Sequence, residues 1–253
     1  MLEIRTLSAG YPGNPVLQDI SMSIPSGAVS VIAGPNGCGK STLLKALAGI
    51  LPASGSVTLD RLDLLALSRR ELAKKVAFLP QNRLIPEITV KNLVLHGRFP
   101  YLSYPRRYRP EDYAAADAAL EEMGIAELAD RTLSTLSGGQ RQKVYIAMAL
   151  AQDTPVVLLD EPNTFLDIAH QLQLMEQAKA LAAQGKTVVL VLHDLAMALE
   201  SADSLVVLSQ GQCLFQGSAE ETFRSGCLDR AFQVAVKRFQ TEEGWKYYFD
   251  AHP

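Results

Sequence analysis

The sequence predicts an α/β fold built around a largely parallel sheet, and three patterns indicate it. Four short aliphatic segments lack polar alternation, as strands covered on both faces do; they are residues 29–33, 76–79, 156–159 and 188–192. Helical stretches such as 41–49 and 169–183 lie between them. This alternation of strand and helix is typical of a parallel sheet.

Nearer the amino terminus the apolar pattern has a period of two residues. Ile20, Met22 and Ile24 alternate with polar residues, and a Pro-Ser-Gly turn follows. This pattern predicts a half-buried strand in an amino-terminal antiparallel β subdomain.

The middle of the chain shows helical periodicity and no convincing strand. Residues 111–123 and 139–152 form the clearest predicted helices. We therefore expect one domain over residues 1–253, with a core of 1–81 and 155–253 and an inserted helical subdomain over 82–154.

Two hairpins are expected near the carboxyl end, because turn residues separate short apolar runs. Gln210-Gly211 separates residues 205–208 from 213–216, and a Glu-Glu-Gly turn separates 234–239 from 245–249. We expect residues 225–253 to form a terminal helix and hairpin packed on the core.

Composition excludes several classes of protein. Hydrophobic residues make up 48% of the 253 residues, and the net charge is only −3, so disorder and bulk attraction to nucleic acid are excluded. The three cysteines, Cys38, Cys213 and Cys227, are widely spaced, which favours a reducing compartment over a disulfide framework or a zinc site. The chain has no signal-peptide pattern, and its aliphatic runs are far shorter than the roughly 20 residues that span a bilayer. Any membrane role is therefore expected to be peripheral.

A glycine-rich loop between a predicted strand and a predicted helix is the first chemical motif. It consists of Gly34, Pro35, Asn36, Gly37, Cys38, Gly39, Lys40 and Ser41. Such a loop turns its backbone amides toward an anion, while Lys40 reaches the β and γ phosphates and Ser41 ligates Mg²⁺. The loop predicts binding of a nucleoside triphosphate. Within it, Cys38 is either a tolerated spacer or a reactive thiol that nucleotide shields.

The second motif is a pair of carboxylates, Asp160 and Glu161, which follows an apolar strand. Ligands of open α/β sheets bind at such strand ends. Asp160 suits the Mg²⁺ shell, and Glu161 suits a residue that orients or deprotonates the attacking water. The pair therefore predicts hydrolysis as well as binding.

The third motif, Leu136-Ser137-Gly138-Gly139-Gln140, opens the predicted helix that runs to residue 152. A hydroxyl and unhindered amides at a helix start form a second anion site. Because it lies far along the chain from Lys40, one hypothesis is that it faces the nucleotide of another subunit.

With these motifs in place, nearly the whole chain resembles the ATP-binding cassette (ABC) ATPases, a family of P-loop NTPases. Five elements occur in family order: the phosphate loop, Gln81, the Ser137 signature, the Asp160-Glu161 pair and His193. The resemblance implies catalytic roles for Lys40, Gln81, Glu161 and His193 and Mg²⁺ ligation by Ser41, Gln81 and Asp160. It implies that ATP is bound by Tyr11, which stacks on adenine, and by Gly34, Pro35, Asn36, Gly37, Cys38, Gly39, Lys40, Ser41, Thr42, Ser137, Gly138, Gly139, Gln140 and Asp167.

Family members pair head to tail, so the resemblance implies a homodimer in which the signature of one chain closes over ATP held by the other. A narrower resemblance, to importer ATPases for ferric siderophores, haem and cobalamin, rests on Leu95-His-Gly-Arg98-Phe-Pro-Tyr101 and Phe165-Leu-Asp167-Ile-Ala-His170-Gln171. It implies transmembrane permease subunits, an extracytoplasmic substrate-binding protein and a location on the cytoplasmic face of the bacterial inner membrane. Asn163 and Ala196 depart from that pattern, where Thr and Asn are usual.

One surface cluster and two rival functions stay open. The cluster consists of Arg98, Arg106, Arg107 and Arg109 among Tyr101, Tyr104 and Tyr108. Its interpretations are RNA stacking, a solvated loop, or, as the family implies and we favour, part of the groove for the permease. The alternative to transport is a soluble ABC ATPase acting on DNA or ribosomes, although we expect no nucleic-acid partner, because the cassette is single and no long coiled coil is present. A nucleotide-binding regulator that barely hydrolyses conflicts with the presence of Glu161 and His193.

Overall fold

The computed structural model describes residues 1–81, 83–163, 166–242 and 244–251. Some sequence predictions fall on residues outside this part of the chain. These residues are Asn82, at the start of the expected helical insertion, Phe165, in the motif before α6, Glu243, in the expected terminal turn, and His252 and Pro253, at the end of the expected terminal segment.

A six-stranded sheet forms the centre of the molecule, in the order β10-β9-β3-β8-β7-β6. Its strands are β3 (Ala28–Ala33), β6 (Val76–Leu79), β7 (Val156–Asp160), β8 (Thr187–Val191), β9 (Ser204–Ser209) and β10 (Gln212–Gly217). Neighbouring strands from β9 to β6 are parallel, and only the pairing of β9 with β10 is antiparallel. Every residue of β7 and β8 is buried. The parallel sheet inferred from the four aliphatic runs is confirmed.

A second, antiparallel sheet has the order β2-β1-β4-β5. It consists of β1 (Leu2–Tyr11), β2 (Asn14–Ile24), β4 (Ala53–Leu59) and β5 (Leu62–Asp63). In β2 the side chains of Ile20, Met22 and Ile24 are buried, and the residues between them are exposed. The predicted antiparallel strand is therefore confirmed, whereas β1 and β4 had no individual prediction.

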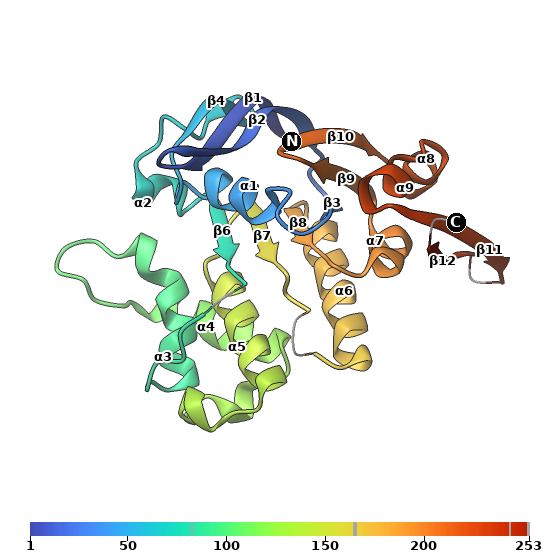
Figure 1. Ribbon diagram of the computed structural model, residues 1–253. Helices are drawn as coiled ribbons and strands as arrows, with labels where there is room; N and C mark the ends of the chain where they lie inside the picture. The colour runs from blue at the N-terminus through green and yellow to red at the C-terminus, as the bar shows by residue number, and fades with distance from the viewer. Residues whose placement is uncertain (82, 164–165, 243, 252–253) are drawn as a thin grey trace.

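The helix α1 (Lys40–Leu47) lies between the two sheets (Figure 1). Its Leu43 and Leu44 belong to one hydrophobic cluster with Ile4 of β1, Leu158 of β7 and Val191 of β8. This packing fixes the start of α1 against the ends of the parallel strands.

The opposite face of the six-stranded sheet packs on α5 (Gly138–Ala151), α6 (Ile168–Ala183) and α7 (Leu195–Ser201). Alternate residues of β7 pack into the two hydrophobic clusters. Val157 and Leu159 belong to the cluster on this face, and Leu158 belongs to the cluster around α1. The sheet is thus covered on both sides.

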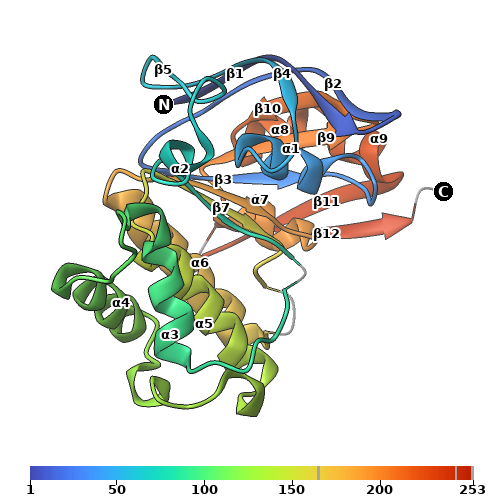
Figure 2. The same ribbon diagram turned by 90° about the vertical axis from the view of Figure 1, so that its left-hand side faces the viewer.

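The segment between β6 and β7 is helical, as expected from its periodicity. It contains α3 (Val90–Leu95), the 3₁₀ turn η1 (His96–Tyr101), α4 (Pro110–Glu122), the 3₁₀ turns Ala126–Leu128 and Leu133–Thr135, and α5. The short α2 (Arg69–Leu72) precedes β6. Figures 1 and 2 show α3, α4 and α5 side by side, beyond the edge of the sheet formed by β6. Apolar residues of α3, α4 and α5 share the cluster that covers the sheet.

Arg98 is a structural residue of this helical segment rather than part of a solvated loop. Its side chain is only 12% exposed and forms an ion pair with Asp112 of α4. It also donates to the carbonyl oxygen of Ala151 and lies 4.0 Å from the ring centroid of Tyr101. The solvated interpretation is wrong for Arg98, because its charge ties η1 to α4 and α5; Arg106, Arg107 and Arg109 are exposed.

The carboxyl end contains both expected hairpins. Gln210 and Gly211 both have positive φ, 48° and 77°, which suits a type I′ turn between β9 and β10. The terminal segment consists of α8 (Ala219–Arg224), α9 (Cys227–Phe232), β11 (Val234–Thr241) and β12 (Gly244–Ala251). The ring of Tyr247 in β12 packs 5.8 Å from that of Phe223 in α8. Within the described ranges, no helix has the length and apolar character needed to cross a membrane.

Gly97 offers a test of how η1 packs on α5. A Cβ at this position would lie 2.2 Å from the carbonyl oxygen of Met148, so the two backbones would have to separate. Gly97→Ala is expected to lower the free energy of unfolding by about 1–3 kcal/mol in urea denaturation.

Gly139→Ala is the matched control, since its Cβ would have no neighbour nearer than 3.8 Å. Alanine there should leave stability unchanged or raise it through helix propensity. Equal unfolding free energies for the two variants would contradict the packing of η1 on α5.

Candidate functional site

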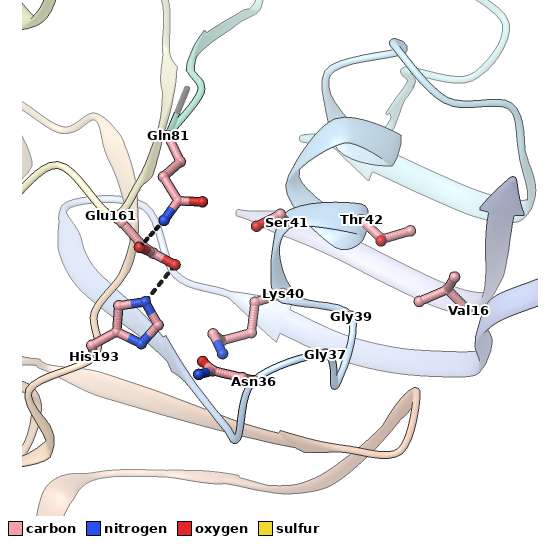
Figure 3. Close-up of a pocket in the computed structure, with 10 residues that line it drawn as sticks. All are labelled: Val16, Asn36, Gly37, Gly39, Lys40, Ser41, Thr42, Gln81, Glu161 and His193. Atoms are coloured by element: carbon pink, nitrogen blue, oxygen red, sulfur yellow. Dashed lines mark hydrogen bonds and ion pairs between the residues drawn. The ribbon is translucent and has the colours of Figure 1, made fainter. Parts of the chain in front are cut away.

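A cavity of about 500 Å³ opens where parallel strands of the central sheet end. Its lining residues come from the loops after β3, β6, β7 and β8, from α1 and from β2 (Figure 3); they are Val16, Asn36, Gly37, Gly39, Lys40, Ser41, Thr42, Gln81, Glu161 and His193. Carboxyl ends of parallel strands are the usual ligand edge of such sheets. The cavity therefore gathers residues of four separate sequence motifs.

The glycine-rich loop curls tightly because two of its glycines leave no room for a side chain. A Cβ on Gly34, whose φ is 157°, would lie 2.2 Å from the carbonyl oxygen of Leu208. A Cβ on Gly39, whose φ is 108°, would lie 2.6 Å from Cδ2 of Leu17. The loop thus depends on glycine to pack against β9 and β2.

Lys40 is the first residue of α1, and its side chain folds back into the loop. Its Nζ donates to the carbonyl oxygens of Gly34, at 2.7 Å, and Pro35, at 3.0 Å. The buried ammonium is therefore held in the concave side of the loop by two neutral acceptors. Phosphate oxygens are stronger, charged acceptors for the same donor.

Cys38 does not have the environment of a reactive thiol. Its side chain is buried, and burial raises the pKa of the thiol above its ordinary value, against the opposing charge of Lys40. Since the thiolate is the nucleophilic form, the structure favours the interpretation of Cys38 as a spacer in the loop.

Asp160 and Ser41 form a pair of oxygen donors beside the loop. The Ser41 hydroxyl donates to Oδ1 of Asp160 at 3.1 Å, and the Asp160 side chain is only 1% exposed. Burial raises the pKa of Asp160, and the hydrogen bond from Ser41 opposes that shift. A hydroxyl and a carboxylate beside a phosphate-binding loop are ligands that Mg²⁺ accepts, so the residues present fit this ion.

Glu161 is held at both of its carboxylate oxygens. Gln81 Nε2 donates to Oε2, and His193 Nε2 lies 2.6 Å from Oε1 (Figure 3). The backbone of Glu161 has a φ of 51°, a left-handed conformation that is unfavourable for a side chain of this size. Three residues that follow three different strands thus meet at one buried carboxylate, while the amide oxygen of Gln81 points toward the side of the cavity where Ser41 lies (Figure 3).

A second cavity, of about 460 Å³, is lined by three residues of the third motif. Ser137, Gly139, Gln140 and Asp167 line it together with Lys143 and His170, among others. Ser137 caps α5: its Oγ accepts from Gln140 N, while Gln140 Oε1 accepts from Ser137 N. None of these residues lines the cavity of Lys40. Within one chain, the two predicted phosphate-binding elements are therefore separate.

Asp167 caps α6 at the edge of the second cavity. Its Oδ1 accepts from the backbone N of His170 at 2.9 Å and contacts His170 Nδ1 at 2.7 Å. These two hydrogen bonds lower the pKa of Asp167. The carboxylate is therefore ionised and anchored beside the signature residues.

Five expected nucleotide contacts are not among the lining residues of either cavity: Tyr11, Gly34, Pro35, Cys38 and Gly138. Gly138 lines neither cavity described above, and Gly34 and Pro35 contribute backbone oxygens to Lys40 instead. Tyr11 is 43% exposed, and its hydroxyl accepts from Lys45 Nζ at 3.3 Å. Its stacking on adenine stays a prediction, and Val16, which does line the cavity, carried no signal beyond its place in an apolar pattern.

Comparison with known proteins gives a consistent match. The family described as ABC transporter matches residues 17–164. The achromobactin transport ATP-binding protein CbrD of Dickeya dadantii (strain 3937) is 43% identical over 91% of this chain and 87% of its own length. The iron(3+)-hydroxamate import ATP-binding protein FhuC of Bacillus subtilis (strain 168) is 42% identical over 92% of this chain and 88% of its own length.

Solved structures agree with these matches. A chain of an inward-facing ABC transporter, described as of the metal-chelate type, superimposes with a TM-score of 0.84 and 28% identity, covering 100% of this chain and 97% of that chain. A dimeric bacterial ABC transporter cassette gives a TM-score of 0.75 at 30% identity, covering 87% and 99%. The fold class expected from the motifs is confirmed.

Asp160 permits a test of whether a buried negative charge beside the first cavity lowers the stability of the folded protein. Because its pKa is raised by folding, the cost of ionising it appears as the pH rises above its ordinary value of 3.8 and is complete above the folded pKa. Asp160→Asn removes that cost, and its amide oxygen still accepts from Ser41. The nucleotide-free variant should therefore melt about 2–4 °C above the unmodified protein at pH 7.

The difference in Tm should shrink as the pH is lowered from 7 to 4, which differential scanning fluorimetry measures. Asp117→Asn is the control, because Asp117 lies at the surface and pairs with Lys91. An Asp160→Asn protein that melts below the unmodified protein at pH 7 would refute this account of the site.

Proposed function

Because this chain belongs to the ABC transporter family of ATPases, we propose that it hydrolyses ATP to drive import of an iron-siderophore or similar metal chelate. The observation that carries the proposal is the carboxylate of Glu161, held by Gln81 and His193 at the edge of the phosphate-loop cavity. A water beside this carboxylate would face phosphates held by Lys40.

In the proposed reaction, Lys40 exchanges its contacts with the loop carbonyls for contacts with the β and γ phosphates. Glu161 orients or deprotonates the attacking water, and His193 donates to the γ phosphate. Ser41, Asp160 and Gln81 are the residues that would hold Mg²⁺, which supplies charge neutralisation on the phosphate oxygens when bound. Gln81 reaches both Glu161 and this side of the cavity, which suits a residue that senses whether nucleotide is present.

We propose that two copies pair head to tail. The separation of the two cavities supports this arrangement, because Ser137 and Gly139 then contact the γ phosphate held by the Lys40 of the other chain. In this arrangement Asp167, which lines the second cavity, would lie at the interface with the other copy. The dimeric cassette among the structural neighbours supports the pairing of two copies. Hydrolysis would remove the shared anion and let the two copies separate.

The cargo and the partners follow from the relatives. Their names assign them to achromobactin transport and iron(3+)-hydroxamate import, and we propose the same class of cargo here. The chain would then associate with permease subunits on the cytoplasmic face of the bacterial inner membrane, and an extracytoplasmic binding protein would deliver the chelate.

Glu161→Gln is the direct test of the catalytic role. The amide cannot accept a proton from water, so kcat for phosphate release should fall by at least about 100-fold. ATP binding should persist, and gel filtration with ATP should show a trapped dimer. Glu176→Gln, in an exposed ion pair with Lys179 on α6, is the control. Unchanged steady-state hydrolysis by the Glu161 variant would sink the proposal.

Fractionation separates transport from the alternative, an ABC ATPase that acts on DNA or ribosomes. We expect the protein, expressed at its native level, to sediment with membranes and to copurify with an integral membrane partner. Nuclease treatment should leave this distribution unchanged. Release into the supernatant by nuclease, together with recovery of nucleic acid, would favour the alternative.

A further inference from the structure

Gln142 is a buried amide on α5, only 4% exposed, to which no role has been given so far. Its Oε1 accepts from Arg83 Nη1 at 2.7 Å, and its Nε2 donates to the carbonyl oxygen of Pro162. One side chain thus joins two segments that border the first cavity. Pro162 follows Glu161 directly, and Arg83 lies two residues after Gln81.

The chemistry of the two neighbours fixes the orientation of this amide. A guanidinium only donates hydrogen bonds and a carbonyl oxygen only accepts them. The opposite orientation would place the amide NH₂ against Arg83 and the amide oxygen against Pro162, which loses both contacts. A residue at position 142 must therefore accept on one side and donate on the other.

Arg83 links Gln142 to Pro80, the residue before Gln81. Its Nε donates to the carbonyl oxygen of Pro80 at 2.7 Å, and its guanidinium lies 4.9 Å from the ring centroid of Tyr145. Burial lowers the pKa of Arg83 to about 10, so the guanidinium is still charged at neutral pH. The Tyr145 hydroxyl donates to the carbonyl oxygen of Leu84.

Gln142 and Tyr145 are three residues apart and share one face of α5. Through this face, α5 holds Pro162, which follows Glu161, by a direct hydrogen bond. It also holds the segment around Gln81, because Gln142 binds Arg83, which in turn binds Pro80. The backbone next to Gln81 and the backbone next to Glu161 are therefore both held by side chains that α5 contacts.

We propose that Gln142, acting with Arg83, is a positioning residue for hydrolysis. It fixes the positions of Gln81 and Glu161 relative to α5, the helix that Ser137 caps. This inference rests on the proposed function, because it assigns the effect to the step that Glu161 catalyses. Gln142 lines neither cavity, so its loss should affect turnover and not the binding of nucleotide.

The test compares Gln142 of α5 with Gln152, the residue that follows the last residue of this helix, in the full-length chain. Gln142→Leu removes both contacts with little change of volume, and kcat for ATP hydrolysis should fall about 10- to 100-fold, with KM for ATP within about twofold. Gln152→Leu is the matched control, because the Gln152 side chain at the end of α5 also donates to backbone carbonyl oxygens, those of Ala73 and Val76. Its kcat should equal that of the unmodified protein, although thermal unfolding should show that both variants lose stability.

Gln142→Glu is a second, nearly isosteric variant that guards against misfolding. The carboxylate keeps Arg83 as a partner but cannot donate to Pro162 at neutral pH. We expect kcat to fall about 10-fold while the affinity for ATP, measured by calorimetry, is unchanged. This split identifies the contact with Pro162 as the one that positions Glu161.

Two results overturn the inference. One is a kcat for Gln142→Leu equal to that of Gln152→Leu, and the other is a raised KM at unchanged kcat. In both cases the unmodified protein still hydrolyses ATP, so the proposed function stands. Absence of hydrolysis by the unmodified protein would instead overturn the proposed function and this inference with it.

Discussion

The parallel pairing of β6, β7, β8 and β3 is the constraint on which the candidate site depends. Parallel strands end at the same edge, so Gln81, Glu161, His193 and the phosphate loop meet although they are far apart in sequence. Every residue of β7 and β8 is buried, so the polar side chains of Glu161 and His193 follow these strands at their carboxyl ends. The site is in this sense a consequence of topology.

Two features of the site lower the stability of the folded chain. Asp160 is a buried carboxylate whose pKa is raised, and Glu161 has a left-handed backbone that its side chain disfavours. Neither feature is needed to hold β7 in the sheet, because its apolar residues already fill both cores. Conformational strain and buried charge concentrated at one strand end are typical of sites selected for chemistry.

The sequence was most informative where local chemistry decides the structure. Buried parallel strands need largely apolar runs, a type I′ turn has two residues with positive φ, here Gln210 and Gly211, and the phosphate loop needs glycine at positions 34 and 39. It was least informative where tertiary packing decides. The strands β1 and β4 mix polar and apolar residues. Arg98, whose neighbours in sequence include exposed arginines, is only 12% exposed and pairs with the buried Asp112. Gln142 and Arg83 belong to the same class, because no local pattern shows that a helix amide will reach two distant loops.

Because the two cavities are separate, the contacts of Gln142 join the helix that begins at the second cavity to loops that border the first. A phosphate bound at Ser137 of one chain belongs, in the proposed dimer, to a nucleotide held by the other chain, so the start of α5 experiences the partner's ligand. Gln142 lies in the second turn of that helix and contacts Arg83 and Pro162, in the segments that follow the proposed catalytic residues Gln81 and Glu161. A helix is stiff over this distance, and a displacement at its first turn therefore carries to Gln142 with little loss. Occupation of one site would in this way alter the position of Glu161 in the other, which gives a physical reason for the two sites of a dimer to act together.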